Sequence, residues 1–300
     1  MIESYCLHVI ILILIYSILA ISFNIQLGYG KLFNLSHVAM FGIGAYTSAL
    51  LTVDMGVPYI IGLICSGLAA VIFILLIGIP ALRLRGDYFA IATLGFAEII
   101  RLVSHNERWL THGQFGISNI VRPEIFGISF SSYESFTIFA LIFVLFTYLF
   151  MERLIKSPFG RVLKGIRENE TAAINLGKNT FKFKLQTMMI CSFFAGLAGS
   201  LYAHYIQYIS PKDFGITPLI SVLVMVVLGG MGNNKGSILG AAILILVPEL
   251  LRFSGMSSDI YGPVRQLIIG LILIVLIIIR PQGLLGEKRF IHKSEAEHNA

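Results

Sequence analysis

The chain alternates between long apolar runs and short polar connections. Nine apolar runs can be drawn, at residues 7–24, 35–53, 57–79, 88–103, 136–151, 185–208, 216–228, 237–251 and 264–279. A helix needs about 20 mostly apolar residues to cross roughly 30 Å of hydrocarbon, and several runs reach that length. The pattern predicts an all-α polytopic membrane protein with about nine transmembrane helices, between roughly eight and ten.

Two of these runs are weaker candidates for a full crossing. Run 88–103 carries Glu98 and Arg101 three residues apart, where side chains on one helix face can pair. Charge at membrane depth is tolerated only where protein or water surrounds it, so this segment is expected to face the interior of the bundle. Run 216–228 is short, and either run would change the count if it formed a re-entrant hairpin.

The longest polar interruption covers residues 152–184 and sets the predicted orientation. Three acidic residues in it, Glu152, Glu168 and Glu170, face eight basic ones: Arg153, Lys156, Arg161, Lys164, Arg167, Lys178, Lys182 and Lys184. Cytosolic loops carry an excess of Lys and Arg, so this loop is predicted to be cytosolic. Counting crossings from it places the amino terminus outside and the carboxyl terminus inside. The predicted organisation is one transmembrane domain over residues 1–286 and a charged cytosolic tail over residues 287–300.

The polar interruption itself predicts two short helices. Ser157 can cap the first helix with Pro158 at its first position. An apolar face follows at Phe159, Val162, Leu163 and Ile166. Asn169 is predicted to cap the second helix and Gly177 to end it, with Ala172, Ala173 and Leu176 on one side. Such amphipathic helices either insert into a groove of a soluble partner or lie on lipid headgroups, and the pattern leaves both open.

A weak internal repeat accompanies the runs. Residues 56–58 open one run with Gly-Val-Pro, and residues 215–218 open another with Gly-Ile-Thr-Pro. Residues 98–102 likewise resemble residues 249–253. The matching order predicts parallel repeats formed by spans two to five and six to nine, an arrangement known in transporters. Chance similarity between apolar segments flanked by Glu and Arg is the alternative.

Composition agrees with a bilayer protein and narrows the chemistry. The chain is 56% hydrophobic and 13% charged, with a mean hydropathy of +0.84 and a net charge of +6. Cys6, Cys65 and Cys191 lie within apolar segments without CxxC spacing, so neither a disulfide framework nor a metal site is expected. The Gly-rich stretch 230–237 lacks the Gly-Lys-Ser/Thr ending of a phosphate-binding loop. The chain is therefore predicted to be no enzyme and to need no cofactor, and ATP-driven work would require another subunit.

Five segments in order carry a resemblance to a known family. They are residues 36–46 (SHVAMFGIGAY), 82–94 (LRLRGDYFAIATL), 167–173 (RENETAA), 226–232 (VVLGGMG) and 280–286 (RPQGLLG). The chain resembles the permeases of branched-chain amino acid ABC transporters, in the high-affinity importer class. The resemblance implies a multi-pass subunit of the cell inner membrane. Its expected partners are a homologous second permease, two ABC ATPase subunits and an extracytoplasmic substrate-binding protein, with an amino acid as substrate.

The resemblance also implies where the ATPase docks. Importer permeases carry a cytosolic E-A-A-x3-G motif, and residues 172–177 keep its A-A-x3-G part, although Thr171 stands where the motif has Glu. The residues expected to couple to the ATPase are Arg167, Glu168, Glu170, Ala172, Ala173 and Gly177. The mechanism implied is alternating access driven by ATP in the partner subunits.

The translocation path is expected among polar groups of the leaner spans. The candidates are Ser36, His37, Thr93, Glu98 and Arg101. Each has a structural alternative, because His37 could be a hydrogen-bonded packing residue and Glu98 and Arg101 could form an interfacial pair. Two other functions stay open at this point. One is ABC import of urea or short amides, and the other is an ion-coupled secondary transporter.

Overall fold

The structure is a computed structural model that describes residues 2–84, 86–125, 127–252, 258–279 and 283–286. The long helices are α1 (Ile2–Asn24), α2 (His37–Val53), α3 (Tyr59–Ala81), α4 (Asp87–Asn106), α6 (Tyr133–Lys156), α9 (Thr180–Ile206), α10 (Ile216–Gly229), α11 (Asn234–Arg252) and α12 (Ser258–Ile279). Each corresponds to one of the nine apolar runs, which confirms the all-α class. The carboxyl-terminal tail and residues 280–282 of the last sequence motif lie outside the described residues.

Several of these helices are suited to crossing a membrane. Within the described part of the chain, six segments have the length and hydropathy of a span: Glu3–Tyr29, Tyr59–Ala81, Asp87–Asn106, Tyr133–Lys156, Thr180–Ile206 and Pro211–Gly229. The shorter helix His37–Val53 is also apolar. The chain is therefore a polytopic membrane protein, and the count of nine crossings and the orientation stay predictions.

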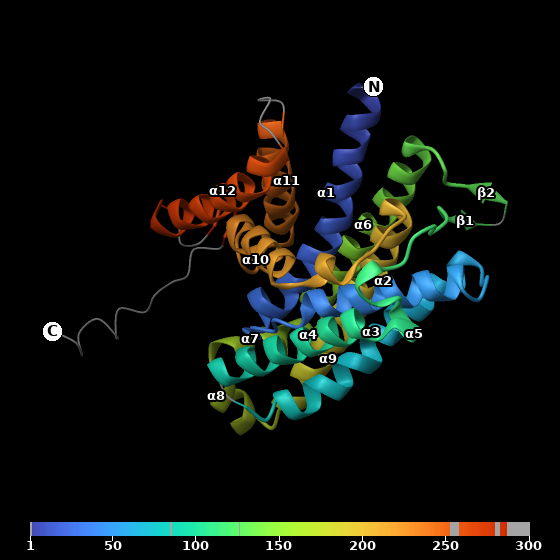
Figure 1. The fold of residues 1–300 in the computed structure, drawn as a ribbon. Helices are drawn as coiled ribbons and strands as arrows, with labels where there is room; N and C mark the ends of the chain where they lie inside the picture. Colours follow the sequence, from blue (N-terminus) through green and yellow to red (C-terminus); the bar gives the residue numbers. More distant parts are fainter. Residues whose placement is uncertain (1, 85, 126, 253–257, 280–282, 287–300) are drawn as a thin grey trace.

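Short elements occupy the connections between the long helices. The polar interruption at residues 152–184 holds α7 (Pro158–Glu168) and α8 (Glu170–Asn175). The connection before α6 holds α5 (Arg108–Thr111), η2 (Gly113–Phe115) and a hairpin of β1 (Glu124–Ile125) with β2 (Ile128–Ser129). A 3-10 turn, η3 (Pro211–Phe214), precedes α10. Figure 1 shows α8 and this hairpin at opposite ends of the molecule.

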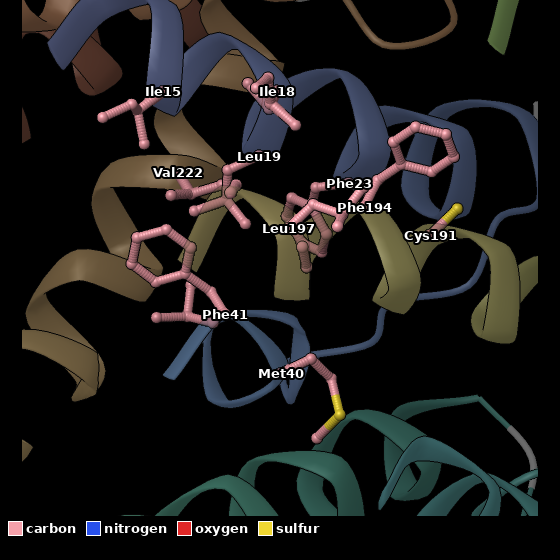
Figure 2. Close-up of a cluster of buried hydrophobic side chains, with 14 of the residues drawn as sticks. Ile15, Ile18, Leu19, Phe23, Met40, Phe41, Cys191, Phe194, Leu197 and Val222 are labelled. Atoms are coloured by element: carbon pink, nitrogen blue, oxygen red, sulfur yellow. The ribbon is translucent and has the colours of Figure 1, made fainter. Parts of the chain in front are cut away.

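The core is formed where α1 and α9 meet the short helices. α9 packs against α2 and α3, whereas α1 packs against α6, α10 and α11. Figure 2 shows side chains of these elements converging, among them Leu19, Phe41, Leu197 and Val222. These side chains are buried because the helices that carry them are apolar around most of their circumference.

Small residues allow α2 and α9 to approach at backbone distance. A Cβ atom added to Gly44 would lie 2.3 Å from the carbonyl oxygen of Gly196, and one added to Gly199 would lie 2.0 Å from that of Phe41. Any side chain at these positions would push the two helices apart. The glycines of this stretch thus have the packing role that small residues commonly have between membrane helices.

The connection between the apolar runs 7–24 and 35–53 is partly helical. α1 continues through a turn of π-helix, η1 (Ile25–Tyr29), all of whose residues are buried. The chain then runs through residues 31–34 to α2. The glycines at 28 and 30 serve close packing in this segment. A Cβ atom at Gly28 would lie 2.3 Å from the backbone nitrogen of Gly232.

Candidate functional sites

Helix α7 forms where the capping signals predicted it. The Ser157 hydroxyl accepts a hydrogen bond from the Gly160 amide at 3.4 Å, and Pro158 stands at the first helical position. The apolar face turns toward the chain's own interior, because Leu163 and Ile166 are buried there. The apolar face of α7 is therefore buried against the rest of the chain, which leaves α8 as the more exposed helix of this loop.

Helix α8 is short, capped at both ends and mostly exposed. The Asn169 side chain accepts a hydrogen bond from the Ala172 amide at 2.9 Å, and Gly177, with φ of +74°, turns the chain away after the last helical turn. Ala173 is only 7% exposed, whereas Ile174 and Leu176 are 53% and 77% exposed. Leu176 does not share the side of Ala173, so the predicted side was wrong. The outward apolar groups are Ile174 and Leu176.

The predicted coupling residues are thus only partly available to a partner. Glu168, Ala172 and Gly177 are exposed, while Ala173 packs inside the chain. The Glu170 carboxylate bonds the Lys184 ammonium at 2.5 Å, which ties α8 to the start of α9. A substitution at Ala173 would disturb the loop itself rather than report on a partner.

Helix α7 contacts two turns at the ends of long helices, namely η1 and the turn between α10 and α11. Its Leu163 lies 3.5 Å from where a Cβ atom of Gly30 would be, and the Lys164 ammonium lies 5.5 Å from the centre of the Tyr29 ring. An Nη atom of Arg167 lies 3.2 Å from the corresponding point on Gly232. Movement of this loop would therefore be passed to η1 and to the turn between α10 and α11.

The buried Asn24, which precedes η1, connects η1 to the turn between α10 and α11. Its side-chain oxygen accepts a hydrogen bond from the Gly232 amide at 2.9 Å, and its amide nitrogen donates to Asn234 at 3.4 Å. Asn234 in turn donates to Glu152 of α6 at 3.4 Å. The turn also receives residues 283–286, since the Leu285 amide donates to the Gly229 carbonyl at 3.0 Å. Parts of three sequence motifs, at 167–173, 226–232 and 280–286, thus meet at one corner of the molecule.

Ser36 and His37 belong to a closed network of hydrogen bonds. Gln26 donates to His37 Nδ1 at 3.3 Å, so the ring proton sits on Nε2, which bonds the Ser22 hydroxyl at 3.0 Å. The side-chain oxygen of Gln26 accepts a hydrogen bond from the Asn34 amide nitrogen at 2.9 Å. The side-chain oxygen of Asn34 accepts one from the Ser36 hydroxyl at 2.7 Å. All five side chains are buried. Their polarity is used inside the chain, as expected of packing residues.

Thr93 is likewise satisfied within the chain. Its hydroxyl accepts a hydrogen bond from the Leu35 amide at 3.1 Å and donates to the Ala90 carbonyl at 2.9 Å. This contact pins the start of α2 to α4. The structure therefore links Ser36, His37 and Thr93 to the α1–α2 connection, whereas Glu98 and Arg101 bond each other.

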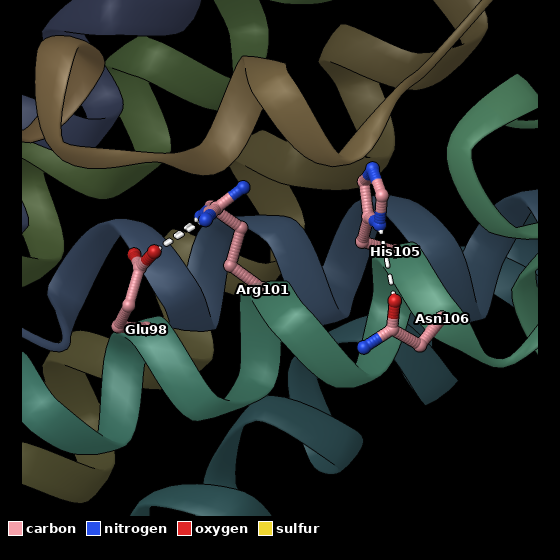
Figure 3. Close-up of polar contacts among 4 residues, drawn as sticks. All are labelled: Glu98, Arg101, His105 and Asn106. Atoms are coloured by element: carbon pink, nitrogen blue, oxygen red, sulfur yellow. Dashed lines mark hydrogen bonds and ion pairs between the residues drawn. The ribbon is translucent and has the colours of Figure 1, made fainter.

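Glu98 and Arg101 lie on the side of α4 that borders α10. The Arg101 Nε donates to Glu98 Oε1 at 2.9 Å, and the Nη2 of Arg101 bonds the same oxygen. Figure 3 shows the two side chains reaching toward each other along one helix, with another guanidinium nitrogen directed away. Their side chains are 34% and 25% exposed, and they line hollows between α4, α2, η3 and α10. Of the five path candidates, these two border open space.

Several polar residues of these sites were missed from the sequence. Gln26 and Asn34 could have been noticed, because amides at the end of an apolar run must find partners once the run is buried. Asn24 and Asn234 carry the same signal at two other run ends. Tyr46 of α2, whose hydroxyl is buried, could not be recognised from the sequence in this way, because a tyrosine in an apolar run commonly marks a membrane interface.

Comparison with known proteins gives a family. The family described as "Branched-chain amino acid transport system / permease component" matches residues 5–277. That match begins within α1, ends within α12, and includes the seven long helices between them and both short helices of the polar loop.

Individual relatives agree with this family. The chain is 36% identical to LivM, a high-affinity branched-chain amino acid transport system permease protein of Escherichia coli strain K12, over 93% of this chain and 69% of that protein. It is 32% identical to a probable branched-chain amino acid transport permease protein LivM of Methanocaldococcus jannaschii, over 71% of this chain and 64% of the relative. A probable LivH permease of the same organism is 28% identical over 53% of this chain and 49% of the relative. No solved structure matches the chain.

Proposed function

The chain belongs to the family of branched-chain amino acid transport system permease components, and we propose that it is one permease subunit of an ATP-driven importer. With a second, homologous permease it forms the path for branched-chain or other hydrophobic amino acids across the cell inner membrane. Similarity to both LivM and LivH relatives supports a pair of unlike permeases built on one plan. ATP hydrolysis belongs to two partner ATPases, and an extracytoplasmic binding protein delivers the substrate.

We propose that the span count and orientation are those of the sequence argument. Nine crossings place the loop 152–184 and the carboxyl-terminal tail in the cytosol and the amino terminus outside. The basic residues of that loop support this orientation.

The observation that supports the coupling proposal is that α7 and α8 differ in the exposure of their apolar side chains. α7 buries its apolar face in the permease, whereas α8 presents Ile174 and Leu176 outward on a helix fixed by caps and by the Glu170–Lys184 pair. An exposed apolar pair on a rigid cytosolic projection is suited to a groove on a partner. In the proposed mechanism, closure of the ATPases on ATP moves α8. α7 carries the movement to η1 and the turn 230–232, and the path opens to the other side.

The docking surface can be tested with one substitution. Leu176→Asp places a charge on the outward face without touching the buried Ala173. We expect the ATPase subunits to be lost when the complex is purified through a tag on this chain, while the second permease is retained. ATP-driven leucine uptake in proteoliposomes is expected to fall more than about tenfold, because desolvating a carboxylate in an apolar groove costs more than 1.4 kcal/mol.

Leu84→Asp is the matched control, because Leu84 is an exposed apolar residue in the connection between α3 and α4. That variant is expected to keep the ATPases. Retention of the ATPases by Leu176→Asp would place the docking surface elsewhere. Uptake by the permeases alone under an ion gradient would instead favour a secondary transporter, and co-purified binding protein loaded with urea or a short amide would change the substrate.

A further inference from the structure

We propose that this chain supplies one wall of a site for a zwitterionic aliphatic amino acid, built around Arg101, Glu98 and Tyr46. The inference rests on the proposed function and names where the permease holds the substrate. Arg101 and the Tyr46 hydroxyl would bind the carboxylate, Glu98 would bind the ammonium group, and neighbouring apolar side chains would receive the aliphatic chain.

The position of α4 supports such a site. It is the least buried of the six candidate spans, with only 11% of its most apolar stretch buried in this chain. At about 1.5 Å per residue, Glu98 lies about 16 Å along the helix from Asp87, near the middle of a bilayer. A charged pair at that depth is costly against lipid, so protein or water must cover this face of α4.

Two adjoining hollows lie beside the charged pair. The first is a small hollow, open on one side, and is lined by Arg101, Tyr46, Ser104 and Phe214 among others. The second is lined by Glu98 together with apolar residues, including Val38, Leu94 and Leu219. Phe214, Ala39 and Ala97 border both hollows. A cation therefore faces one hollow and an anion the next, with apolar walls between them.

The polar atoms retain capacity for a ligand. Arg101 uses Nε and Nη2, and Glu98 uses Oε1, for their mutual bond, so within the described residues Nη1 and Oε2 have no partner. The Tyr46 side chain is 6% exposed, and its buried hydroxyl finds no hydrogen-bond partner among the described residues. A buried hydroxyl is costly to leave unbonded, and Tyr46 lines the same hollow as Arg101, so in the proposed site both would donate to a carboxylate bound there.

The space for Arg101 depends on its neighbour. A Cβ atom on Gly215, at the start of α10, would lie 3.3 Å from Arg101 Cδ. The guanidinium is thus fitted between α4 and the start of α10, and α10 is one of the two helices joined by the turn 230–232. The open side of the hollows is where the second permease would complete the site.

The test uses the reconstituted complex with both permeases, the ATPases and the binding protein, and follows radiolabelled L-leucine taken up per ATP hydrolysed. Tyr46→Phe removes only the hydroxyl and is expected to lower this ratio about tenfold. Tyr59→Phe is the control, because Tyr59 is also buried without a hydrogen-bond partner in the described part of the chain but lies outside both hollows. It is expected to leave the ratio unchanged.

A double variant separates a ligand site from a structural ion pair. Glu98→Arg combined with Arg101→Glu keeps an attractive pair but reverses the charge facing each hollow. Loss of leucine uptake in an assembled complex would support the site, and uptake at the unsubstituted level would overturn it. If the double variant does not assemble, Tyr46→Phe decides, since a ratio equal to that of Tyr59→Phe overturns the proposal. Failure of the unsubstituted complex to import leucine would instead contradict the proposed function.

Discussion

At the scale of single residues, the buried network around His37 makes a stability prediction. His37→Ala removes one hydrogen-bond partner each from Gln26 and Ser22 and leaves a cavity beside Phe23, whose ring stacks on the imidazole at 5.1 Å between centroids. We expect a loss of about 2–4 kcal/mol in the free energy of unfolding. The apparent unfolding midpoint of the detergent-purified chain should then fall by roughly 5–10 °C.

His105→Ala is the corresponding control. Among the described residues, the partly exposed His105 side chain bonds its neighbour Asn106 at 3.2 Å and no other side chain (Figure 3). Its removal is expected to change the free energy of unfolding by less than about 0.5 kcal/mol. Equal midpoints for the two variants would mean that the His37 network does not stabilise the fold.

Residue polarity alone could not separate these two kinds of site. Ser36, His37, Thr93, Glu98 and Arg101 give the same signal in the sequence, namely a polar group in an apolar run. Which of them meets a partner inside the chain depends on the path of residues 25–36, and the π-helical turn there has no distinct sequence signature.

At the scale of elements, the contact of α2 with α9 makes a packing prediction. Gly44→Ala would place a methyl group 2.3 Å from the Gly196 carbonyl oxygen, with backbone atoms rather than a flexible side chain in the way. Separating the helices should cost about 1–3 kcal/mol, typical of overpacking. The measurement is the unfolding midpoint of the purified chain, together with the yield of folded protein.

Gly95→Ala is the control for helix propensity. A Cβ atom at Gly95 meets nothing within 4 Å in the described residues, so this variant should be neutral or stabilising by up to about 1 kcal/mol. A Gly44→Ala chain as stable as Gly95→Ala would show that α2 and α9 are not held at backbone distance.

The elements also show how far sequence reasoning extends. Hydropathy located all nine long helices, and the caps Ser157 and Asn169 located α7 and α8. The outward face of α8 was missed, because a helix of six residues has too few turns for a periodicity, and its orientation depends on contacts with the rest of the chain, such as the buried Ala173 and the Glu170–Lys184 pair.

At the scale of the whole molecule, packing suggests a grouping that the sequence comparison did not. The chain can be divided into two groups of four helices, α1–α4 and α9–α12. The first helix of each group packs against the other group, because α9 packs on α2 and α3, and α1 packs on α10 and α11. Residues 25–33 (IQLGYGKLF) and 206–214 (IQYISPKDF) share Ile, Gln, Lys and Phe at the same spacing after those helices. This pairing differs from the expected repeat of spans two to five with six to nine, which stays a prediction. On nine crossings it would relate units of opposite direction.

The orientation of the whole chain makes the last prediction, because nine crossings put the two ends on opposite sides. A membrane-impermeant maleimide applied to intact cells should label native Cys6, which is exposed near the start of α1, and should label Ser131→Cys before α6. In a Cys6→Ser background, Lys178→Cys after α8 and Ser294→Cys in the tail should react only after the cells are opened.

Labelling of Cys6 and of the Ser294→Cys variant from the same side would mean an even number of crossings. A helix such as the lean α4 or the short α10 would then enter and leave by one face. Labelling of Asn106→Cys, at the end of the helix that carries Glu98 and Arg101, distinguishes these two cases. A re-entrant α4 would expose this cysteine to the cytosolic side, whereas a spanning α4 exposes it to the outside.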